Sequence, residues 1–111
     1  MKQMQYTVLI TFDLNYAQSD DYRLVNKYLS EVGFEQLSHK GNKLPSNTYL
    51  GVETEMIGAY EAESDGAERV KSRVYKSLKR TMTASGISSV VFVMVAPANK
   101  TRYSCSQPKN F

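Results

Sequence analysis

The spacing of the apolar residues changes along the chain, and this change most constrains the fold. In residues 6–14 and 89–97 apolar side chains occupy alternate positions or form an unbroken run, which is typical of β-strands. In residues 24–32 and 70–82 they recur at every third or fourth position, which is typical of helices buried on one side. The chain has 111 residues, so we expect one domain in which strands and helices alternate.

The residues that flank the helical segments predict where each helix begins and ends. Ser19 is a candidate N-cap for the first helix, and Gly33 is expected to end it. Asp65 and Glu68 have the spacing of a capping box ahead of the second helix, and Gly86 is expected to end that helix. Both helices should therefore be amphipathic and lie against a sheet.

Two further segments, 34–40 and 48–54, read as strands joined by a turn. Added to the other strands and helices, they give the order β–α–β–β–α–β. We therefore expect an α+β, ferredoxin-like domain over residues 1–97, with a four-stranded antiparallel sheet and two helices on one face. The expected hairpin argues against the alternative, a small open α/β sheet. Residues 98–111 form a polar tail, either disordered or a short strand that a dimer could exchange.

The sheet face away from the helices should be polar unless something packs on it. Alternation places Val8, Ile10 and Phe12 on one face, and Leu9 and Asp13 on the other. The last strand, "VVFVMV", is apolar on both faces. We therefore expect the open face to be covered by a second copy or by the tail, and a twofold homodimer is the simplest arrangement. Tyr49 is expected on this face, where it could stack on a base.

The cysteine content and the hydrophobic runs bear on location. A single cysteine, Cys105, cannot form an internal disulfide, which fits a reducing compartment, and we assign it no chemistry. No segment has the length of a membrane span or the layout of a signal peptide. The sequence therefore predicts a cytoplasmic protein that does not enter a membrane.

The charged residues are segregated along the chain. The net charge is +3, with 14 Lys plus Arg against 11 Asp plus Glu. Residues 53–68 hold acids and no cation, whereas residues 69–80 hold six cations and no acid. We therefore expect one strongly positive surface. The four cations spaced to share a helix face, and thus predicted to bind RNA or DNA, are Arg69, Arg73, Lys76 and Arg80. The alternative is an ordinary solvated helix exterior.

Several segments resemble the Cas2-like family of small ferredoxin-like proteins. The first strand ends in Asp, "VLITFDLN", and is followed by "DDYRLVNKYLSEVGF" and "EQLSHK". "LITFDLN" with "KLPSNTYLGVE" also resembles the SinR-like branch. The family includes CRISPR adaptation proteins, VapD-type toxins and an antitoxin endoribonuclease. The resemblance covers residues 6–54 best. The region "QLSHKGNKLPSN" departs from the Cas2 proteins proper, which argues against a role in CRISPR spacer acquisition.

The resemblance implies a homodimer that binds nucleic acid. In some members the aspartates that end the two first strands face each other across the dimer axis, bind a divalent metal and support phosphodiester cleavage. Asp13 holds that position here, so the resemblance makes it the catalytic and metal-binding residue, with Mg²⁺ or Mn²⁺ as the metal. Arg23 falls where the family often has a basic residue. The implied protein is a metal-dependent endonuclease or endoribonuclease of a toxin–antitoxin or defence system.

Alternatives remain for each of these residues. Asp13 can equally end a strand and accept hydrogen bonds from loop amides. His39, the only histidine, is expected to be a surface residue, because no acid or base is spaced to pair with it as a catalytic group. The rival function is a non-catalytic dimeric module that binds another protein or regulates it.

Overall fold

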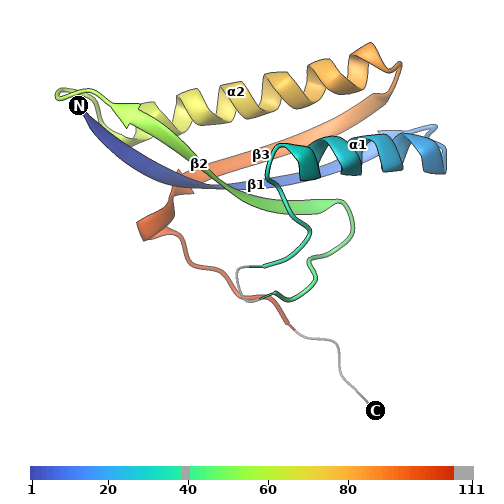
Figure 1. The fold of residues 1–111 in the computed structure, drawn as a ribbon, viewed down its shortest axis with the longest axis horizontal. Helices are drawn as coiled ribbons and strands as arrows, with labels where there is room; N and C mark the ends of the chain where they lie inside the picture. Colours follow the sequence, from blue (N-terminus) through green and yellow to red (C-terminus); the bar gives the residue numbers. More distant parts are fainter. Residues whose placement is uncertain (39–40, 107–111) are drawn as a thin grey trace.

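The computed structural model describes residues 1–38 and 41–106 and shows an α+β fold. Three strands form an antiparallel sheet in the order β2–β1–β3, and two helices cover one face of it (Figure 1). The elements are β1 (Lys2–Asn15), α1 (Ser19–Glu31), β2 (Thr48–Ile57), α2 (Glu63–Ala84), β3 (Ser88–Pro97) and the short 3₁₀ helix η1 (Ala98–Lys100).

The expected four-stranded βαββαβ sheet is wrong, because residues 34–38 do not form a strand. Glu35 forms one isolated antiparallel bridge with Leu50 at the edge of β2. The chain then turns back on itself: the Leu44 amide donates to the Gln36 carbonyl over 2.8 Å, and Leu37 bridges Lys43. This local pairing directs the segment away from β2 after one residue, so the element order is β–α–β–α–β.

The alternation expected for the first strand is confirmed. Every second side chain of β1 faces the helices and is buried: Tyr6, Val8, Ile10, Phe12 and Leu14. The helices bury stripes against them, at Val25 and Leu29 in α1 and at Val70, Val74, Leu78 and Met82 in α2. Burial of these apolar side chains is the main stabilising contribution to the fold.

The helices start slightly earlier than the sequence predicts. Gln18, not Ser19, precedes α1, and its amide donates to Asp21 Oδ2 over 3.0 Å. Ala62 precedes α2, and its amide donates to Asp65 Oδ2 over 2.8 Å. In both helices a carboxylate in the first turn accepts a backbone N–H that has no partner within the helix. Gly33 follows α1 with φ of +94°, a conformation that ends helices and favours glycine.

Gly66 lets the start of α2 lie very close to the sheet. A Cβ atom at this position would clash with Ile57 Cδ1 and with the Tyr6 hydroxyl. Tyr6 is fully buried, and its hydroxyl donates to the Glu63 carbonyl over 2.8 Å. Burial raises the pKa of Tyr6. This contact fixes the first turn of α2 over β1 and β2.

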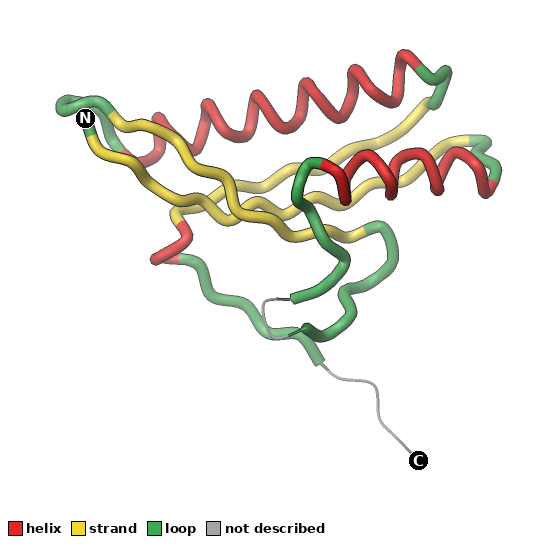
Figure 2. Tube along the Cα trace, viewed as in Figure 1, coloured by secondary structure: helices red, strands yellow, loops and turns green. Residues whose placement is uncertain are grey.

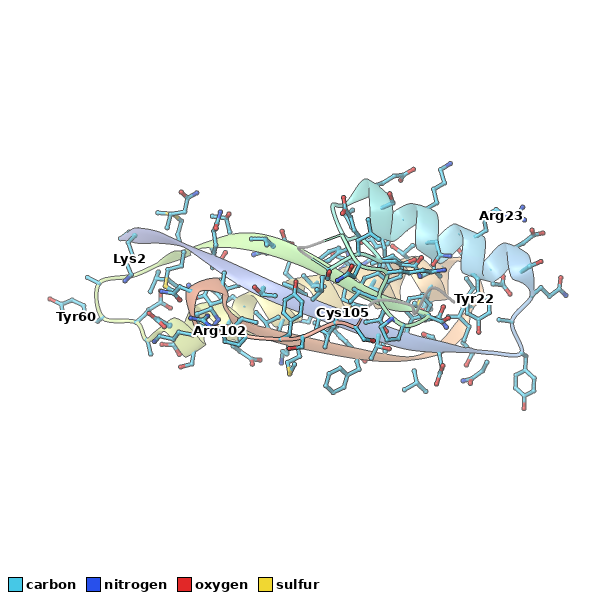
Figure 3. The ribbon with its side chains drawn as sticks, turned by 90° about the horizontal axis from the view of Figure 1, so that it is seen from below. Lys2, Tyr22, Arg23, Tyr60, Arg102 and Cys105 are labelled. Atoms are coloured by element: carbon cyan, nitrogen blue, oxygen red, sulfur yellow. The ribbon has the colours of Figure 1, made fainter. Side chains whose placement is uncertain are left out.

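The chain after α1 and the chain after η1 run along the other side of the sheet (Figures 1 and 2). Seen from that side, Arg102 and Cys105 lie in front of the strands (Figure 3). Cys105 Sγ lies 3.6 Å from the Lys43 carbonyl oxygen, which joins the tail to the loop before β2. The tail therefore covers part of this open face, and within the described residues it adds no strand after Pro97. His39 and residues 107–111 lie outside the described residues.

None of the helices in the described part of the chain is long and apolar enough to cross a membrane.

Candidate functional site

Asp13 lies near the end of β1 on the open face of the sheet. Its side chain is exposed, and its neighbour across the sheet is Val90 of β3. Within residues 1–38 and 41–106 the Asp13 carboxylate accepts no hydrogen bond and forms no ion pair. The turn-forming role considered for Asp13 thus has no hydrogen bond to support it, and the carboxylate faces solvent.

An apolar strip lies beside Asp13. Val90, Phe92 and Met94 occupy alternate positions of β3 on the open face, and 64%, 53% and 54% of their surfaces are exposed. We call these three residues the β3 strip. The strand carries no charged side chain, and β3 is the outermost strand of the sheet on its side. Exposed edge strands in proteins usually carry charges or bulges that prevent pairing, and this one does not.

The segregated charges of the sequence meet in the folded chain. Arg69 is the centre of the network: its Nε donates to Glu55 Oε2 over 2.7 Å, its Nη1 pairs with Glu61, and its Nη2 donates to the Met56 carbonyl over 2.7 Å. Arg73 Nη1 donates to the same Glu55 at Oε1 over 3.1 Å. The acids of β2 and of the following turn therefore hold α2 against the sheet.

These contacts change the charge that the protein presents. The hydrogen bonds from Arg69 lower the pKa of Glu55 and of Glu61, and these carboxylates in turn raise the pKa of Arg69. Two other acid–base pairs lie on the same part of the surface, Lys71 with Glu68 at 2.6 Å and Lys100 with Glu63 at 2.8 Å. The expected strongly positive surface is wrong for this end of α2, because its cations are paired.

The second half of α2 keeps exposed cations. Lys76 and Arg80 are exposed and form no ion pair with any described residue. Arg23 on α1 is also exposed and pairs with Asp20 one turn away at 3.4 Å. Of the five residues predicted to bind nucleic acid, Lys76, Arg80 and Arg23 are thus open to a partner, whereas Arg69 and Arg73 contribute to the fold.

Tyr49 faces the helices and not the open face, so its expected role in stacking a base is wrong. Its position opposite Ile10 puts it on the buried side of β2, where its ring stacks on Phe12 with 6.1 Å between centroids. The Tyr49 hydroxyl donates to Asn26 Oδ1 of α1, and burial raises the pKa of Tyr49. The residue links α1 to the sheet.

Asp13 could hold a divalent metal only together with a second copy of the chain. Within the described residues no three or more His, Cys, Asp or Glu side chains gather into a metal site. Mg²⁺ usually takes one or two carboxylates together with water and substrate phosphates. Asp13 from one chain supplies a single exposed carboxylate, so Mg²⁺ or Mn²⁺ would need two copies that bring both Asp13 side chains together.

No protein-family model, curated protein or solved structure matches the chain. The resemblance to the Cas2-like family therefore stays a prediction from the residues quoted above. Glu53 could not be identified from the sequence as a residue near the helices, because the side of β2 that it occupies depends on the pairing with β1.

Proposed function

We propose that the protein acts as a homodimeric interaction module and that the β3 strip is the surface through which two copies pair. The observation that carries the proposal is the exposure of three large apolar side chains in a row, on a strand without charge. Apolar patches of this kind on small proteins commonly mark association sites.

A second copy of the chain suits this surface better than an unrelated protein, because the β3 strip is apolar and its strand is uncharged. A twofold axis through the strip would place the strip of one chain against the same strip of the other, so that apolar atoms meet apolar atoms. No like charges would face each other along the strand, because β3 has none. The middle of the open face is less available, because Leu50 and Thr7 are buried there beneath the loop before β2 and the tail.

The experiment is a measurement of mass by sedimentation equilibrium over a range of concentrations. The intact chain is compared with Phe92→Ser and with Met56→Ser. Met56 is a matched control, since it lies on the same open face but on β2, with 44% of its surface exposed. We expect the intact chain and the Met56 variant to be dimers and the Phe92 variant to dissociate. A monomeric mass for the intact chain at high micromolar concentration would overturn the proposal.

A second candidate is a dimeric, metal-dependent nuclease, and it is favoured by the position of Asp13. This carboxylate is next to the β3 strip, opposite Val90. Packing of two strips face to face would bring both Asp13 side chains to the same interface, where together they could bind Mg²⁺ or Mn²⁺. Such a metal could activate a water and neutralise charge on a scissile phosphate. Lys76 and Arg80 would remain exposed on the helices and could bind phosphates.

Cleavage assays separate the two candidates. Single-stranded RNA and duplex DNA are incubated with Mg²⁺ or Mn²⁺ and with the intact chain, Asp13→Ala or Glu31→Gln, the last being an exposed acid on α1. Cleavage that is lost only with Asp13→Ala supports the nuclease. Equal cleavage by the intact chain and Asp13→Ala removes Asp13 from the mechanism. A dimer that binds neither polymer at low salt leaves the interaction module as the function.

A further inference from the structure

A cleft between α1 and α2 opens above β2 and has a volume of about 210 Å³. Its walls are apolar, with Leu29 from α1, Phe34 from the loop after it, and Val74 and Leu78 from α2. A charged residue, Glu53, also lines it. The cleft lies on the opposite side of the sheet from the β3 strip.

Glu53 has no partner among the residues that the structure describes. It shares the helix-facing side of β2 with Glu55, but only Glu55 accepts hydrogen bonds from Arg69 and Arg73. The Glu53 side chain is partly buried, and within the described residues it forms no hydrogen bond and no ion pair. Because Glu53 is only partly buried and lines the cleft, its carboxylate is available to a cationic group that enters there.

Arg73 lines the same cleft from α2. Its Nη1 is bonded to Glu55, and it does not pair with Glu53. A guanidinium carries five N–H groups and can bind a second carboxylate in addition to the first. The cleft therefore presents an acceptor for an ammonium group, a donor for a carboxylate, and an apolar surface between α1 and α2.

We propose that this cleft binds a free α-amino acid with an apolar side chain, of about the size of leucine. The ammonium group would pair with Glu53, the carboxylate with Arg73, and the side chain would lie against Val32 and Tyr28, the apolar cleft residues that keep exposed surface. Sites for drug-sized ligands have volumes of roughly 300–1,000 Å³, so a cleft of about 210 Å³ suits a smaller molecule. The proposal does not depend on whether the protein forms a dimer or cleaves nucleic acid.

The test is calorimetric or NMR titration of the intact chain with leucine and two analogues. Isoamylamine lacks the carboxylate, and isocaproate lacks the ammonium group. We expect leucine to bind and each analogue to bind at least about tenfold more weakly, as expected for the loss of one charged contact. Glu53→Gln should weaken leucine binding by a similar factor and leave isocaproate binding unchanged. Glu35→Gln, an exposed acid outside the cleft, is the control and should bind leucine normally.

A second variant tests the location. Ser77 lines the cleft and is partly exposed, so Ser77→Leu should fill the space with a stable fold. We expect it to abolish leucine binding, with a melting temperature at or above that of the intact chain. The proposal would be overturned if leucine did not bind at millimolar concentration. It would also be overturned if leucine bound equally to the intact chain, to Glu53→Gln and to Ser77→Leu.

Discussion

Replacement of Gly66 by alanine should destabilise the protein, although alanine is the better helix former. Gly66 lies in the first two turns of α2, and an added methyl group would occupy space taken by the Tyr6 hydroxyl and by Ile57 Cδ1. Neither neighbour can move freely, since Tyr6 is fully buried and Ile57 is 3% exposed. The helix must then shift away from the sheet, or Tyr6 must give up its bond to the Glu63 carbonyl.

The size of the effect follows from three contributions. The gain in helix propensity from Gly to Ala is at most about 1 kcal/mol. Overpacking of a well-packed site typically costs about 1–3 kcal/mol, and the loss of the Tyr6 hydrogen bond costs about 1 kcal/mol more. The free energy of unfolding should therefore fall by about 2 kcal/mol, which lowers the melting temperature by roughly 8 °C in a domain of this size.

Urea unfolding followed by far-ultraviolet circular dichroism measures this difference. Tyr6→Phe provides the matched test, because it removes the hydroxyl that the methyl group would meet. We expect Gly66→Ala to cost about 1 kcal/mol less in the Tyr6→Phe background than in the intact chain, as residues in direct contact are not additive. Thr83→Ala, at an exposed position of the same helix, should change stability by less than about 0.5 kcal/mol.

Two results would refute the reasoning. If Gly66→Ala raised the free energy of unfolding, propensity would outweigh packing, and the close approach of α2 to the sheet would be absent in solution. If the substitution cost the same in both backgrounds, the Tyr6 hydroxyl would not be the atom that excludes a side chain at this position.

Three other predictions concern the strip, the ion pairs and a strained turn. Phe92→Ser should weaken the dimer about 30-fold by sedimentation, because burying the exposed half of this ring in each copy stabilises the pair by about 2 kcal/mol. Glu55 and Glu61 have pKa values below the usual 4.5, so their stabilising contribution is present above that pH and lost as the pH falls further. Arg69→Met should therefore reduce the loss of stability at acid pH, measured as the fall of the urea midpoint of unfolding as the pH is lowered below 4.5. An equally steep fall in the variant would contradict this. Tyr16 is fully exposed and has φ of 53°, a left-handed conformation that glycine adopts more easily than tyrosine. Tyr16→Gly should therefore stabilise the protein by about 1 kcal/mol, measured by thermal unfolding. A loss of stability would show that the backbone at Tyr16 is not strained.

The sequence was sufficient to predict the elements that bury one face. In β1, alternation identified Val8, Ile10 and Phe12 as core residues because a strand places every second side chain on the same side. In α2, the recurrence of Val70 and Val74 every fourth residue identified the buried stripe for the same kind of reason. These patterns are local, and burial is their physical cause.

The absence of the expected fourth strand could not be predicted, because the segment can pair with either of two neighbouring segments. Residues 34–38 read as a weak strand closed by a turn, and Glu35 does begin to pair with β2. The next residues pair instead with 42–44, which are nearer along the chain. A short loop closes at a lower cost in entropy than a long one, so the local pairing competes successfully with an extended edge strand.

Which side of β2 faces the helices could also not be predicted from the sequence. Its alternation separates Tyr49 and Glu53 from Leu50 and Val52, but both sets contain residues that could be buried. The register with β1 decides, since Tyr49 lies opposite the buried Ile10. A shift of one residue would exchange the two faces. For this reason the base-stacking role of Tyr49 was wrong and the cleft residue Glu53 was missed.

The same register explains why segregated charge in the sequence did not become segregated charge on the surface. β2 is followed after a short turn by α2, which folds back over it, so Glu55 and Glu61 pair with Arg69 and Arg73. A block of acids next to a block of cations along a strand–turn–helix unit should pair in this way whenever the turn is short.

The groups that the fold leaves without a partner are then candidates for binding other molecules. Glu53 above the sheet and the β3 strip below it have no partner in the described chain, and they lie on opposite faces. Pairing of two copies through the strip would leave the cleft open, so association and ligand binding are compatible in one small domain.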